Sequence, residues 1–315
     1  MVFLFFKHKE ILVKKILIGS IIFSLTIMNC GKVKDDPEIT ASITKAVANC
    51  EVDTRYASLK NCKENADKDL KDMIKNKGPA ASLPSLAVAL NNDDIKVAAT
   101  AASVMYSNIK DYMTKVSEKP ESVDGKVLDL FMKGLEKYKS EYFTMYAVRS
   151  VVHLAMIKGD KKIIGFLKSH SEKAVKSEGL TYLMQFGRMK VFDEVKELAG
   201  DKETVRIALK NPRNMYKLSA DEEKTVCDWA MGFLDSEDMT ASGNAAMTIA
   251  TRCKGEYLDK LLDKVEKAAE AGELKGDYKS SLTNFSFSCQ SFMGSQPTGT
   301  TEQCERKAKI LEKAQ

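Results

Sequence analysis

Histidine is scarce in this sequence, and the familiar catalytic motifs are missing. Only His153 and His170 of the three histidines lie beyond the first thirty residues. Neither has a His or Cys four residues further on, so a zinc site has no support. No Gly-rich phosphate loop, nucleophile elbow or H-E-x-x-H motif occurs. We therefore expect no enzyme, no bound metal and no cofactor, and we interpret His153 as a hydrogen-bonded core residue and His170 as a helix-end residue.

A strong excess of one charge is absent as well. The whole chain has a formal net charge of +5, and its first 29 residues hold four lysines and one glutamate. The remaining residues therefore keep only about two net positive charges. Proteins that bind nucleic acids usually show a strong basic excess. The composition argues against a nucleic-acid partner, while the length allows one large domain or two small ones.

The start of the chain differs in character from the rest. Lys7, Lys9, Lys14 and Lys15 precede thirteen uncharged residues, 16–28. A basic stretch followed by a short apolar run is typical of an export signal. Thirteen helical residues reach only about 20 Å, whereas a spanning helix must cross a hydrocarbon core of about 30 Å. The pattern therefore favours a cleaved signal over a permanent transmembrane anchor.

The apolar run ends at a cysteine in a recognisable setting. The residues Ile27, Met28, Asn29 and Cys30 resemble the lipobox of bacterial lipoproteins. Asn29 replaces the Gly, Ala or Ser usual before the cysteine, as in the relaxed lipoboxes of spirochaete lipoproteins. The resemblance implies that Cys30 carries acyl chains, palmitate among them, and that the chain is cut just before it. The alternative is an ordinary signal peptide, with Cys30 free to form a disulfide.

The chain is accordingly expected to fall into three parts. Residues 1–29 are interpreted as the lipoprotein signal peptide, residues 30–38 as a polar tether, and residues 39–315 as the folded domain, with a subdivision allowed near 200–220. This places the protein in the cell envelope, at the outer membrane in preference to the inner one. The side of the membrane stays open.

The cysteines fit an oxidising compartment. With Cys30 used by lipid, six of the seven cysteines remain, and none is part of a C-x-x-C pair. An even number in an exported protein favours three disulfides over buried free thiols. The six fall into three local pairs, and antiparallel helical hairpins would join Cys227 with Cys253 and Cys289 with Cys304. The expected pairs are Cys50 with Cys62, Cys227 with Cys253, and Cys289 with Cys304.

Apolar residues beyond the signal recur at helical spacing, whereas strand-like alternation is hard to find. One such stripe is Leu258, Leu261, Leu262, Val265 and Ala269. Ser219 with Glu222, and Thr300 with Gln303, have the spacing of capping boxes that begin helices. We interpret the six prolines, at positions 37, 79, 84, 120, 212 and 297, as loop or first-turn residues. The predicted fold class is all-α.

Several segments also look alike. The starts 94–98, 140–144, 171–175, 236–240 and 276–280 can be aligned as the second helices of successive hairpins, with a further hairpin near 205–216. Small residues such as Ala101, Ala147, Gly179 and Gly243 fall about seven positions after these starts. The pattern resembles the HEAT and armadillo type of α-solenoid, in which stacked helix pairs bury a face against their neighbours. An irregular helical bundle is the alternative.

Aromatic residues near the starts of these second helices are the candidate binding surface. They are Tyr142, Phe143, Tyr146, Tyr182 and Phe186. Second helices commonly line the concave face of a solenoid, where exposed aromatic rings serve as anchors. We expect a lipid-anchored envelope protein that binds a protein partner, from the envelope or from a host. A structural spacer, a carrier of hydrophobic ligands and an enzyme are the alternatives.

Overall fold

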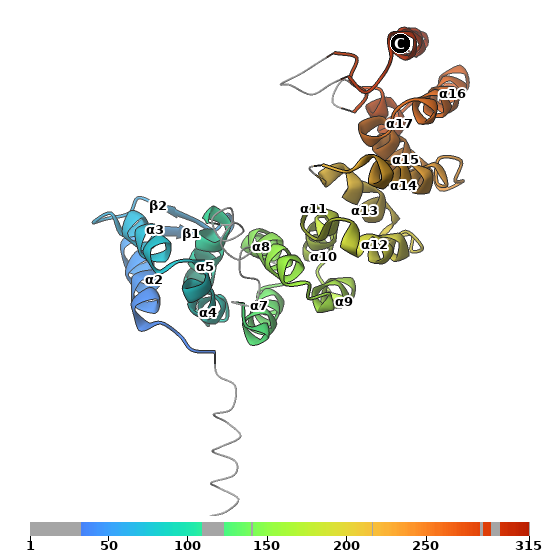
Figure 1. The fold of residues 1–315 in the computed structure, drawn as a ribbon. Helices are drawn as coiled ribbons and strands as arrows, with labels where there is room; N and C mark the ends of the chain where they lie inside the picture. The colour runs from blue at the N-terminus through green and yellow to red at the C-terminus, as the bar shows by residue number, and fades with distance from the viewer. Residues whose placement is uncertain are drawn as a thin grey trace, which may run out of the picture.

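The computed structural model describes residues 33–108, 123–139, 141–215, 217–283, 286–290 and 297–314. Over these ranges the protein is all-α, as predicted, with one two-stranded sheet. Figure 1 shows the helices following one another from the N-terminal part to the C-terminal helix at the far end.

The helices and strands have the following bounds: α2 Pro37–Asn49, β1 Glu51–Asp53, β2 Ser58–Lys60, α3 Ala66–Lys77, α4 Pro79–Leu90, α5 Ile95–Ser107, α7 Gly125–Lys137, α8 Tyr142–Lys158, α9 Lys162–Ser169, α10 Lys173–Thr181, α11 Leu183–Gly187, α12 Phe192–Leu198, α13 Val205–Lys210, α14 Ala220–Met231, α15 Met239–Arg252, α16 Glu256–Glu270, α17 Gly276–Ser281 and α18 Thr301–Lys313. Short 3-10 turns, η2 Arg188–Val191 and η3 Asn211–Asn214, follow α11 and α13.

The predicted helix starts are present. Ser219 and Glu222 form a complete capping box at α14, and Thr300 and Gln303 form another at α18. In each, two backbone N–H groups that lack a partner within the helix are satisfied by side chains. Helix α2 begins at Pro37, inside the stretch predicted as tether, with Asp36 as its N-cap.

The interpretation of the prolines is wrong at Pro84, which lies inside α4. A proline has no N–H to donate and therefore removes a hydrogen bond of the helix. The flanking residues Ser82, Leu83, Ser85 and Leu86 are all buried, so packing holds this turn in place. Tertiary packing here overrides the local preference against helix. Pro120 lies outside the described residues.

The two strands are the main feature of the fold that the sequence did not predict. β1 and β2 pair antiparallel, with Val52 opposite Leu59, and the disulfide Cys50–Cys62 closes the base of this hairpin. Each strand has only three residues, too few for alternating hydrophobicity to be recognised. Both strands contact α5, so the hairpin is packed against the helical core.

The segments that were aligned as second helices form a continuous row. They correspond to α5, α8, α10, α15 and α17, and α13 lies in the gap left for a further hairpin. Successive members of this row contact one another, from α5 to α17. The row supports a repeat-like stacking, although the assignment to the α-solenoid type stays a prediction.

Small residues allow two of these helices to approach their neighbours closely. A Cβ atom added at Gly179 would lie 2.5 Å from a methyl carbon of Leu167 on α9. One added at Gly243 would lie 2.8 Å from Cβ of Asp277 on α17. Both distances are shorter than van der Waals contact, so glycine is needed where the helices meet. The alanines Ala101 and Ala147 are fully buried.

All three expected disulfides are present. Cys227 on α14 and Cys253 at the end of α15 are joined across an antiparallel helical hairpin, with Cα atoms 5.8 Å apart. Cys289 is joined to Cys304 of α18, but it lies outside any helix, so the hairpin argument is wrong for this pair. Three hydrogen bonds between Ser288 and Thr298 bring the two stretches together instead.

The buried apolar residues form two clusters. The larger runs from α2 to the first half of α15, and the smaller runs from α14 to α18. The two helices of the disulfide-linked hairpin, α14 and α15, contribute to both. The subdivision predicted near 200–220 stays a prediction.

The part of the chain that the structure describes includes no helix with the length and apolarity required to cross a bilayer. The predicted signal segment and Cys30 lie outside the described residues.

Candidate binding groove

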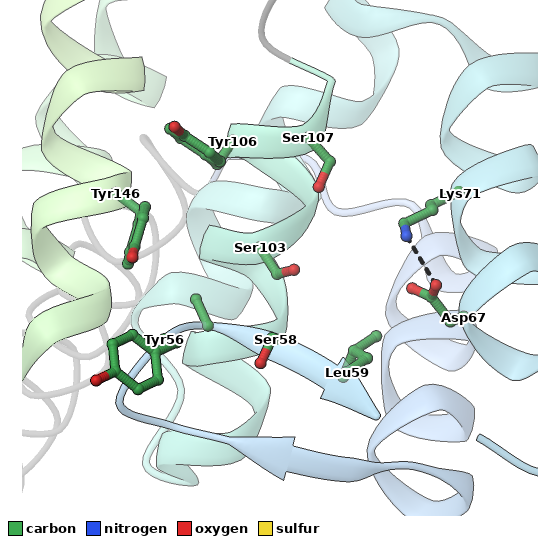
Figure 2. A pocket seen from close by; sticks show the side chains of 10 residues that line it. Tyr56, Ser58, Leu59, Asp67, Lys71, Ser103, Tyr106, Ser107 and Tyr146 are labelled. Carbon is green, nitrogen blue, oxygen red and sulfur yellow. Dashed lines mark hydrogen bonds and ion pairs between the residues drawn. The ribbon is translucent and has the colours of Figure 1, made fainter. Parts of the chain in front are cut away.

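Exposed tyrosines gather on one face of the N-terminal part. Tyr56 is 48% exposed, Tyr106 42% and Tyr142 49%, although large apolar side chains usually pack inside. Together with Tyr146 they line two adjoining hollows, of about 260 and 230 Å³. We call these two hollows the tyrosine groove. Figure 2 shows how Tyr56, Tyr106 and Tyr146 reach the first hollow from the hairpin, α5 and α8.

The hairpin turn positions Tyr56. The carboxylate of Asp53 accepts hydrogen bonds from the backbone N–H groups of Arg55 and Tyr56, at 3.1 and 3.3 Å, and from Lys60 Nζ at 2.9 Å. These bonds hold the pKa of Asp53 below its usual value, the bond from Lys60 being the main cause. The turn is therefore ordered by polar contacts that leave the Tyr56 ring facing outward.

The guanidinium of Arg55 lies beside two tyrosine rings. Its Cζ atom is 5.2 Å from the centroid of Tyr56 and 5.1 Å from that of Tyr142, distances typical of cation–π contacts. The two rings are 6.3 Å apart and tilted by 47°. This contact connects the hairpin to the start of α8 and makes one continuous edge of the groove.

The floor of the groove is formed where α5 and α8 meet. Tyr106, near the end of α5, lies edge-on to Tyr146 of α8, with ring centroids 5.1 Å apart. Ser103 and Ser107 come from the same helix as Tyr106 and add hydroxyl groups to the lining. In Figure 2 an ion pair between Asp67 and Lys71 of α3 borders the other side, at 2.7 Å.

The far end of the groove carries a pair of opposite charges. Arg149 and Glu178 line the second hollow. Burial raises the pKa of Glu178, although the nearby Arg149 acts in the opposite direction. The Arg149 guanidinium lies 4.4 Å from the ring centroid of Tyr182. The groove thus combines aromatic faces with a few groups that can orient a ligand through hydrogen bonds or charge.

The predicted aromatic residues divide into three kinds. Tyr142 and Tyr146 line the groove, as part of the candidate surface. Tyr182 and Phe186 are half-buried and lie beside its far end. Phe143 is fully buried, so its inclusion in the surface was wrong. The reason is the helical period, because neighbouring residues point about 100° apart and only Tyr142 faces outward.

Two groove residues were missed from the sequence. Tyr56 lies 86 positions before Tyr142, in a hairpin that was not predicted. Tyr106 lies at the end of α5, whereas the candidate surface was predicted from aromatic residues near the starts of helices. The only available signal was the spacing of Tyr106, eleven residues after the start of a helix whose other residues are mainly small.

Neither histidine takes part in the groove lining. His153 stacks on Phe186, with ring centroids 3.7 Å apart and planes at 14°. Its packing is therefore aromatic, whereas a hydrogen bond was predicted. His170 is buried at the end of α9 and accepts a hydrogen bond from the backbone N–H of Glu172. Within the described residues, no cluster of His, Cys, Asp and Glu could hold a metal ion.

Acid is expected to destabilise the fold through His153. Burial, helped by Arg149, lowers the pKa of this imidazole to about 3. Between this value and the ordinary 6.5 the unfolded chain binds a proton that the folded chain does not, so stability falls as the pH drops through this window. The slope approaches about 1.4 kcal/mol per pH unit.

This expectation can be checked by chemical denaturation between pH 7 and 4, comparing the wild type with His153→Asn. The free energies of unfolding of the two proteins should converge as the pH falls. Parallel pH profiles would contradict a buried, neutral His153.

Comparison with known proteins gives no identification. No family model, no curated protein and no solved structure matches the chain. The features that point to a function are therefore the geometry of the groove and the N-terminal sequence.

Proposed function

We propose that this protein is a lipid-anchored lipoprotein of the cell envelope, at the outer membrane, that binds a protein partner through the tyrosine groove. The observation that carries the proposal is the convergence of three exposed tyrosines from three separate elements. Tyrosine offers a large, rigid ring and a hydroxyl group, and it is enriched at interface hot spots. The anchoring at Cys30 is supported by the lipobox resemblance and by the basic stretch and short apolar run before it.

Each hollow of the groove is by itself smaller than a usual ligand pocket, which favours side chains of a partner over a whole small molecule. Ligand pockets usually enclose about 300 to 1,000 Å³. The two hollows hold about 260 and 230 Å³ and meet along the shared residues Tyr56, Tyr106 and Tyr146. Two small hollows in line suit two side chains of an extended segment. The exposed rings at the rim would then provide the surrounding contact.

The proposal is tested by crosslinking and pulldown from envelope extracts with the full-length protein. The double variant Tyr56→Ala/Tyr142→Ala should recover its partner at least about fivefold less well, since hot-spot residues contribute above about 1 kcal/mol each. Met239→Ala is the matched control, because Met239 is equally exposed but lies on α15. Partners should be identified by mass spectrometry.

Two results would count against the groove. Equal recovery by the wild type and the double tyrosine variant would place binding elsewhere on the protein. Recovery of no partner by any of the three proteins would favour the structural spacer.

A further inference from the structure

A third hollow, lined by none of the tyrosine groove residues, lies where the described chain begins. It measures about 650 Å³, and its apolar lining comes from Val33, Val88 of α4 and Leu130 of α7. The three side chains are half-buried, so each leaves apolar surface open to the exterior. In Figure 1 the described chain starts below α4, on the side opposite to β1 and β2. The described chain therefore begins on the side of the N-terminal part away from the hairpin that carries Tyr56.

The position of this hollow is restricted by the proposed lipid anchor. Cys30 precedes Val33 by three residues, and three extended residues span at most about 11 Å. If Cys30 carries acyl chains in the bilayer, Val33 must lie within that distance of the headgroup region. The side of the hollow that Val33 lines is then held close to the membrane surface.

The polar rim fits phospholipid headgroups. Lys126 and Lys133 of α7 are exposed and border the apolar lining, on the same face of the helix as Asp129. Lysines at a membrane surface keep their apolar stems along apolar groups and extend their ammonium groups to phosphates. The carboxylates of Asp35 and Asp129, which also line the hollow, suit the ammonium of a zwitterionic headgroup.

From this placement we infer that the hollow lined by Val33, Val88 and Leu130 is a membrane seat, in which the protein rests on zwitterionic phospholipid beside its own anchor. The inference depends on the proposed anchoring at Cys30 and adds an orientation to it. Seated in this way, α7 faces the bilayer. The β1–β2 hairpin and the tyrosine groove are then directed away from the membrane, where a partner can reach them.

The test uses lysine reactivity in the full, lipidated protein. The protein is reconstituted into vesicles of phosphatidylethanolamine and phosphatidylcholine, floated on a density gradient, acetylated and mapped by mass spectrometry. Vesicle-free Cys30→Ser protein is the reference. Lys126 and Lys133 should react at least about fivefold more slowly on vesicles, the factor that about 1 kcal/mol of apolar burial gives. Lys309 on α18 is exposed and should not change.

A variant tests the apolar part of the seat. Leu130→Gln should restore the reactivity of Lys126 and Lys133 on vesicles while the protein still floats. Leu311→Gln on α18 is the matched control, because Leu311 is half-buried like Leu130 but lies at the far end of the chain. This control should keep both lysines protected.

The possible results of this experiment distinguish a failure of the membrane seat from a failure of the proposed anchoring at Cys30. A protein that floats with Lys126 and Lys133 as reactive as in the reference overturns the seat and leaves the anchoring intact. A wild-type protein that does not float overturns both. Reactivity of Lys126 that falls with concentration in vesicle-free protein shows that a second copy covers the hollow, which also overturns the seat.

Discussion

Replacing Cys30 by Ser is expected to move the protein from the membrane pellet to the soluble fraction. Acyl chains contribute about 0.8 kcal/mol per buried CH₂ group, and stable anchoring needs two such chains or one chain with a second signal. Serine accepts no thioether-linked lipid, so the variant loses this energy. The uncharged run 16–28 does not replace it, because its reach of about 20 Å is short of the hydrocarbon core.

Fractionation followed by immunoblotting measures this effect, and the variant Cys50→Ser/Cys62→Ser is the control. It removes two cysteines from a hairpin in the folded domain and should stay in the pellet. Mass spectrometry of the wild type should find a lipid-modified N-terminus at Cys30. A chain that begins at Met1 with an unmodified thiol at position 30 would refute the anchoring and, with it, the assigned compartment.

Replacing Phe143 by Ala is expected to lower the free energy of unfolding by about 3–5 kcal/mol. The side chain of Phe143, on α8, is completely buried, and its ring lies 5.5 Å from that of Tyr138, the residue that follows α7. The substitution leaves a cavity that the surrounding helices cannot fill. Because whole domains are stable by only about 5–15 kcal/mol, this change takes a large share of the total.

The neighbouring residue provides the control for this experiment. Tyr142 is 49% exposed, so Tyr142→Ala should change stability by less than about 1 kcal/mol. Urea denaturation followed by circular dichroism measures both variants. The two residues should also differ in binding, since only Tyr142 reaches the groove. Equal loss of stability in both variants would contradict the placement of α8.

The helices could be predicted because their signals are local. The capping boxes at Ser219 and Thr300 and the stripe from Leu258 to Val265 each lie within a few turns of one helix. The pairing of Cys227 with Cys253 followed from a hairpin whose turn is equally local. Pro84 is the exception, since the packing around α4 cannot be read from its neighbours in sequence.

The groove was only partly predictable because its walls are distant in sequence. Tyr142 and Tyr146 were identified from the helical pattern, but the same pattern could not separate them from the buried Phe143. The position of Tyr56 depends on a hairpin whose strands have three residues each, too few for a recognisable strand pattern in the sequence. Its contact with Tyr142 through Arg55 arises only in the tertiary structure, so a local sequence pattern does not predict it.

The distance in sequence between Tyr56 and Tyr142 determines when the groove can form. The contact between Tyr56 and Tyr142 closes a loop of more than eighty residues, which costs conformational entropy, and it needs the whole intervening chain to have been made. An exported chain that crosses the inner membrane unfolded carries these tyrosines as isolated side chains. Under the proposed export route, the binding surface is therefore assembled only after translocation, and partners in the cytosol never meet it.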